Sequence, residues 1–137
     1  MVELVDYSIS YGECVGYCTS VLTIDGTVVE LVQTSNDPAE PPRRFTGAVE
    51  ADLSHKIASE AATLDPRGLR TIYGEPDARD EGAVTVQIRR HGGVTEHTYS
   101  RGGPPVEFAA LDTLVSPILL GWIDGEAPTG VRFNEVP

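Results

Sequence analysis

The sequence has few basic residues, and lysine occurs in it only once. Ten Lys and Arg side chains stand against 21 Asp and Glu in the 137-residue chain, which gives a formal net charge of -11. Binding to a nucleic-acid backbone needs clustered Lys and Arg, and so does electrostatic attachment to anionic lipid. We therefore expect no nucleic acid and no membrane as a partner, while a basic protein partner suits the charge.

The chain also lacks a long apolar run and a secretory leader. Its most apolar stretch, 106–123, is interrupted by Glu107, Asp112 and Pro117, so we interpret it as a buried helix and not as a membrane span. Residues 1–6 contain no basic segment followed by an apolar one, as a signal peptide would. We expect a cytoplasmic protein, although a secreted chain whose signal has been removed would begin in the same way.

No complete catalytic motif is present in the sequence. It contains neither a G-x-S-x-G nucleophile turn nor a glycine-rich phosphate loop with its lysine. The only two cysteines, Cys14 and Cys18, have a C-x3-C spacing that differs from the C-x-x-C of thioredoxin-like enzymes. A zinc site would need two further ligands. We therefore predict no catalytic residue, no metal and no cofactor.

Cys14 and Cys18 are instead a candidate redox or disulfide pair. In an extended strand, residues four apart lie roughly 13 Å from each other, whereas a disulfide needs Cα atoms within about 7 Å. Gly16 between them allows the required turn. We predict that the two cysteines lie close enough to bridge and that the bond is dispensable for folding. Two separate buried cysteines remain the alternative, because oxidation depends on the compartment.

Apolar and polar residues alternate along several segments, which predicts β-strands. Asp25-Gly26 is the strongest short hairpin signal, and a two-residue turn there pairs Leu22 with Val29. The predicted strands are 3–11, 18–24, 27–33, a short one near 44–46, 84–89 and 94–100.

The second hairpin determines the face on which His97 lies. A turn at Gly92-Gly93 places His97 across from Ile88, on the apolar face of the strand. We interpret it first as a hydrogen-bonded structural histidine and second as a catalytic base. The candidate pocket residues are His97, Tyr99 on the same face, and Arg101 in the loop that follows.

Two segments have the spacing of amphipathic helices. The first covers about 49–64, and the second follows Pro105 and contains Pro117, which should kink or break it. The order β-β-β-(β)-α-β-β-α predicts an α+β domain over 1–123, with an antiparallel sheet and two helices packed on one face. Residues 124–137 are expected to form a C-terminal tail. The helical positions expected in the core are Val49, Leu53, Ile57, Ala61, Phe108, Leu111, Val115, Ile118 and Trp122.

The region around the cysteines resembles a family of small bacterial domains of unknown function, often found in lipoproteins. Members have a strand leading into C-x-G-x-C-P, and then a strand that ends in a D-G turn. Cys14-Val15-Gly16-Tyr17-Cys18 and Ile24-Asp25-Gly26 match these two parts, with Thr19 in place of the proline. The resemblance covers 5–120. It implies a similar order of elements and no established activity.

Two functional hypotheses follow from these features. The first is a small non-enzymatic binding or protein-interaction domain that binds a basic partner, as an immunity protein does. The alternative is a small-ligand or thiol-dependent enzyme built around Cys14, Cys18 and His97, which requires a cysteine within hydrogen-bond reach of the histidine. The lack of a catalytic motif favours the first hypothesis. The oligomeric state is not specified by the sequence.

Overall fold

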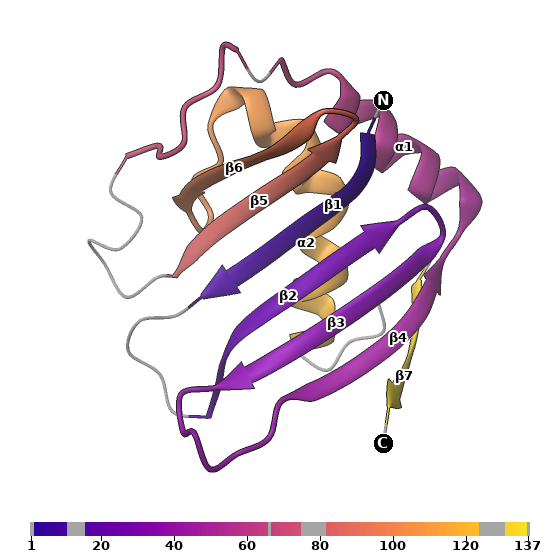
Figure 1. The fold of residues 1–137 in the computed structure, drawn as a ribbon, viewed down its shortest axis with the longest axis vertical. Coiled ribbons are helices and arrows are strands. Elements are labelled where there is room, and N and C mark those ends of the chain that lie inside the picture. The colour runs from indigo at the N-terminus through magenta and orange to yellow at the C-terminus, as the bar shows by residue number, and fades with distance from the viewer. Residues whose placement is uncertain (1, 11–15, 66, 75–81, 124–130, 137) are drawn as a thin grey trace.

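Seven antiparallel strands form one sheet in the order β6-β5-β1-β2-β3-β4-β7, and both helices pack on the same face of it (Figure 1). The computed structural model describes residues 2–10, 16–65, 67–74, 82–123 and 131–136, without the side chains of 121–123. The predicted α+β class is confirmed. The elements are β1 (Val2–Ser10), β2 (Tyr17–Asp25), β3 (Val28–Ser35), β4 (Arg43–Val49), α1 (Ala51–Ala62), β5 (Ala83–Arg90), β6 (Gly93–Ser100), a 3-10 turn (Val106–Phe108), α2 (Ala109–Ile123) and β7 (Val131–Val136).

The core lies between the sheet and the two helices. Alternate residues of each central strand point toward the helices, as the period of two predicts, and they are buried there together with the apolar stripe of each helix. Trp122, which was expected in this core, has a side chain outside the described part. The largest fully buried side chains are Tyr7, Tyr99, Phe45, Phe108, Ile9, Leu22, Leu31, Ile57, Ile88, Leu111, Ile118 and Leu119.

The first hairpin turns one residue later than predicted. Asp25 pairs with Val28, so the turn residues are Gly26 and Thr27, and Leu22 is opposite Leu31 instead of Val29. Gly26 has a φ of 59°, and a glycine with positive φ at the first central position is what a type II′ turn requires.

The second hairpin turns one residue earlier than predicted, at His91 and Gly92. His97 is therefore opposite Val86 and not Ile88. A shift of one residue on both strands leaves every side chain on its predicted face, and His97 does point into the core, with 3% of its surface exposed.

A kink or a break was predicted at Pro117, and the break does not occur. α2 is continuous from Ala109 to Ile123 and contains the proline. Pro117 and Thr113 are both exposed. The Thr113 carbonyl, which loses its helical donor to the proline, is therefore on the side of the helix that water can reach. No helix within the described residues is long and apolar enough to cross a membrane.

The expected tail contributes a strand, which the predicted order lacked. β7 pairs antiparallel with β4 along its length, from Val131 opposite Val49 to Val136 opposite Arg44. This pairing also explains why β4 covers seven residues and not the short stretch near 44–46. Val131 is buried against the core, so the strand closes one end of the hydrophobic layer.

Candidate functional site

Cys18 and His97 do not come together in the fold. Cys18 is buried on β2, while His97 is on β6. The strand order places β5 and β1 between them, which separates the two strands by about 14 Å. A thiol–imidazole pair between these two residues is therefore ruled out by the topology.

The prediction that the two cysteines lie close enough to bridge is not tested, because Cys14 lies outside the described residues. Gly16 has a φ of 91°, a left-handed conformation that suits the expected turn. The Cys18 sulfur lies 3.2 Å from the Gly16 carbonyl oxygen.

His97 is held inside the core by one hydrogen bond. Its Nδ1 lies 2.6 Å from the Arg70 carbonyl oxygen, and because a carbonyl oxygen only accepts, Nδ1 is the donor. Nε2 is buried and has no hydrogen-bond partner among the described residues. The ring lies against Phe108, with centroids 5.2 Å apart. This arrangement fixes the segment before β5 to the edge strand β6, and it is the geometry of a structural histidine.

Tyr99 belongs to a polar cluster that the sequence did not reveal. The hydroxyls of Tyr7 and Tyr99 both donate to Oδ1 of Asp112, at 2.8 and 2.7 Å. Burial raises the pKa of both tyrosines, and for Tyr7 the nearby Asp112 carboxylate raises the pKa further. The cluster joins β1 and β6 to α2. The only sequence signal for it was that Asp112 interrupts the apolar 106–123 stretch.

Arg101 is the third candidate pocket residue. It is half-buried in the loop after β6, and its backbone N–H donates to the Gly82 carbonyl oxygen at 3.1 Å. His97 and Tyr99 point into the core against Phe108. Of the three candidate pocket residues, His97 and Tyr99 therefore share one contact inside the core.

The tyrosine cluster predicts a loss of stability in alkali. The unfolded chain loses tyrosine protons near the ordinary pKa of 10.0, while Tyr7 and Tyr99 keep theirs to higher pH when folded. The folded state then binds more protons, so the free energy of unfolding is fully retained below about pH 10 and falls above it.

We expect Tyr7→Phe with Tyr99→Phe to flatten this fall, measured by denaturant unfolding between about pH 8 and about pH 11. Tyr17→Phe is the control, because its hydroxyl bonds to the Pro41 carbonyl at the surface. An equal pH slope in the double variant and the wild type would exclude the cluster as the cause.

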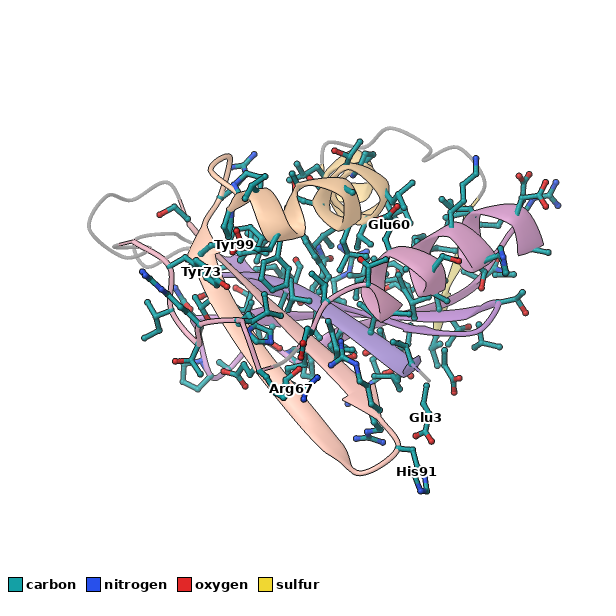
Figure 2. The ribbon with its side chains drawn as sticks, turned by 90° about the horizontal axis from the view of Figure 1, so that it is seen from above. Glu3, Glu60, Arg67, Tyr73, His91 and Tyr99 are labelled. Carbon is teal, nitrogen blue, oxygen red and sulfur yellow. The ribbon has the colours of Figure 1, made fainter. Side chains whose placement is uncertain are left out.

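The face of the sheet opposite the helices is the larger candidate surface. Figure 2 shows both helices on one side of the sheet, and no described helix covers the other side. The register places one row of outward side chains across all seven strands. From β6 to β7 this row is Glu96, Gln87, Asp6, Thr23, Glu30, Thr46 and Asn134, and we call it the acidic row.

The acidic row carries a carboxylate on every second strand from β6 to β3 and contains no basic residue. Strands lie about 4.8 Å apart, so neighbouring carboxylates stand about 10 Å from each other. Glu96 accepts a hydrogen bond from Gln87 at 2.7 Å. Asp6 in the middle of the row has a buried Oδ1 without a hydrogen-bond partner in the described part of the chain.

Apolar and basic side chains flank the acidic row on the same face. Val28, Val94 and Val136 are 62%, 52% and 41% exposed there. Arg44 lies 3.6 Å from Glu30 in an exposed ion pair. The face therefore combines exposed valines with carboxylates that have few hydrogen-bond or ion-pair partners among the described residues.

Among the described residues, no three His, Cys, Asp or Glu side chains gather in a way that could hold a metal ion. The resemblance to small bacterial domains of unknown function stays a prediction. No model of a known protein family matches this sequence, and no curated protein is significantly similar to it.

Proposed function

We propose that this chain is a non-enzymatic protein-interaction domain that binds a basic protein partner through the helix-free face of its sheet. The acidic row, flanked by exposed valines, is the observation that carries the proposal. Three carboxylates lie along one line of this face without a basic residue between them. A partner that presents Lys or Arg along a complementary line gains both attraction and a defined orientation.

The exposed valines indicate that this face binds a protein and not only small ions. Protein interfaces place apolar contacts beside polar ones at the same surface, and Val28 and Val94 flank the acidic row in this way. The solvated face of an antiparallel sheet otherwise carries mainly polar side chains. The net charge of -11 adds long-range attraction for a basic partner and speeds encounter.

A basic peptide tests the location of binding directly. Nona-arginine is titrated into methyl-labelled protein, and the methyl resonances of Val28, Val32 and Val94 on the helix-free face are followed by NMR. We expect these resonances to shift, while those of Val115 and Leu119, which are buried on α2, stay in place. Shifts confined to the helix side would contradict the proposal.

Two variants with the same net charge distinguish binding at the acidic row from a general effect of the protein's negative charge. Asp6→Asn, Glu30→Gln and Glu96→Gln together should weaken peptide binding roughly ten-fold, because each exposed charge pair contributes a small factor. The control carries the same change in net charge at exposed loop and turn positions, namely Glu40→Gln, Glu50→Gln and Glu107→Gln. An equal loss in both variants would show that binding depends on net charge alone.

A further inference from the structure

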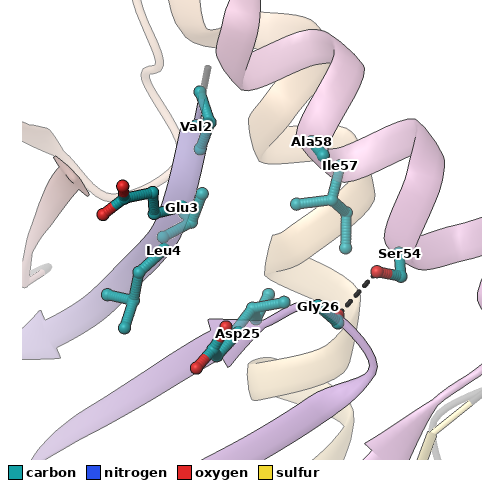
Figure 3. A pocket seen from close by; sticks show the side chains of 10 residues that line it. Val2, Glu3, Leu4, Asp25, Gly26, Ser54, Ile57 and Ala58 are labelled. Atoms are coloured by element: carbon teal, nitrogen blue, oxygen red, sulfur yellow. Dashed lines mark hydrogen bonds between the residues drawn. The ribbon is translucent and has the colours of Figure 1, made fainter. Parts of the chain in front are cut away.

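A pocket of about 200 Å³ opens at the end of the sheet where β1 and β2 separate (Figure 3). β1 pairs with β2 only from Val5, which is opposite Ile24. The preceding residues are paired with β5 instead, across an irregularity between Val2 and Leu4. α1 crosses this gap, and the Ser54 hydroxyl donates to the Gly26 carbonyl oxygen at the β2–β3 turn. The pocket is therefore held open by backbone pairing and by a fixed helix.

The floor of the pocket is apolar. Val5, Ile24 and Ile57 line it and are 2%, 4% and 1% exposed, and Ala58 of α1 adds a small side chain at its wall. Pockets for drug-sized ligands usually measure about 300–1,000 Å³. The volume here is smaller than that range and suits a single unbranched side chain.

The rim of the pocket is acidic. Glu3 and Asp25 are exposed and line it, and its ten lining residues include no base. Figure 3 shows both carboxylates on the sheet side of the pocket, away from α1. The sole lysine, Lys56, borders a different groove, between α1 and α2. An occupant with an apolar stem and a cationic tip matches both parts of this site.

We infer that the pocket takes a lysine side chain of the basic partner. The four-carbon stem of lysine covers the apolar floor, and its compact ammonium suits two separate carboxylates better than a planar guanidinium does. The identity of the partner rests on the proposed function. Leu4 and Asp25 line the pocket and also lie on the helix-free face, so a partner seated on that face reaches the pocket.

The test uses two small probes and needs no partner. Nα-acetyl-lysine amide and Nα-acetyl-norleucine amide share the same stem, and only the first carries an ammonium. We expect both to shift the methyl resonances of Val5, Ile24 and Ile57, with the lysine probe binding about two- to five-fold more tightly, as one exposed charge pair allows. Equal affinity for the two probes, or shifts elsewhere only, would overturn the inference.

Two variants locate the binding within the pocket. Ala58→Leu fills the pocket from an exposed helical position and should abolish the methyl shifts, while Ala62→Leu, exposed on the same helix outside the pocket, should leave them unchanged. Unchanged lysine binding by Ala58→Leu would overturn the site. If Ala58→Leu fails to fold, the double variant Glu3→Gln with Asp25→Asn tests the site instead. It should remove the preference for the lysine probe over the norleucine probe. A retained preference would overturn the inference.

These outcomes are distinct from those of the nona-arginine titration. Suppose that the pocket binds the lysine probe selectively, but that the acidic-row variant and its control lose the same affinity for nona-arginine. The lysine pocket would then be supported and the proposed function would be rejected. If changing the acidic row weakens nona-arginine binding but the two small probes bind with equal affinity, the interaction face would be supported and the lysine pocket would be rejected.

Discussion

Replacing Phe108 with alanine is expected to lower the free energy of unfolding by roughly 3–5 kcal/mol, which is typical for a buried phenylalanine. The side chain is 0% exposed. Its ring lies 5.9, 5.2 and 5.7 Å from the rings of Tyr73, His97 and Tyr99. Its removal leaves a cavity between the start of α2, the edge strand β6 and the segment docked on that strand.

Denaturant unfolding measures this effect, and a residue of the same turn provides the control. Val106 is 85% exposed, so Val106→Ala should change the free energy of unfolding by less than about 0.5 kcal/mol. A Phe108→Ala variant as stable as the control would show that the contact of α2 with β6 is not part of the folded core.

Gly47→Ala should destabilise the protein by roughly 1–3 kcal/mol and release β7 from the sheet. A Cβ at this position would lie 1.8 Å from the Arg132 carbonyl oxygen and 3.1 Å from the Phe133 Cα. Both are backbone atoms of β7, so relief requires the strand to move. In an ordinary strand, the same substitution stabilises by about 0.5–1 kcal/mol, and the sign of the effect is therefore diagnostic.

Hydrogen exchange of the β7 amides, measured beside chemical denaturation, reports both parts of this prediction. Exchange in β7 should accelerate while exchange in β1 and β5 follows global stability. The control is Gly68→Ala, where the nearest atom to the added Cβ is the Asp65 carbonyl oxygen at 3.9 Å, so little change is expected. A stabilised Gly47→Ala protein with protected β7 amides would contradict the close approach of β4 and β7.

The first six strands along the chain and both helices were predictable because their signals are local. Alternation in steps of two identified the residues of β1 that face the core, and Ile57 and Ala61 recur at helical spacing and are buried. β7 was missed because six residues carry too short a pattern. It is stabilised by β4, a strand more than eighty residues earlier in the chain, and by the absence of a side chain at Gly47.

The candidate sites could not be predicted from the sequence, because they are formed by contacts between residues far apart in the chain. The sequence placed His97 and Tyr99 on one buried face because both belong to one strand. Asp112 joins Tyr7 across 105 positions. The acidic row forms only because the register sets Glu96, Asp6 and Glu30 in one line across the sheet. Periodicity assigns a face to each side chain, whereas strand order and register decide its neighbours. The sequence by itself therefore determined the α+β class and the buried faces, and only the tertiary structure decided which charges, rings and strand ends meet.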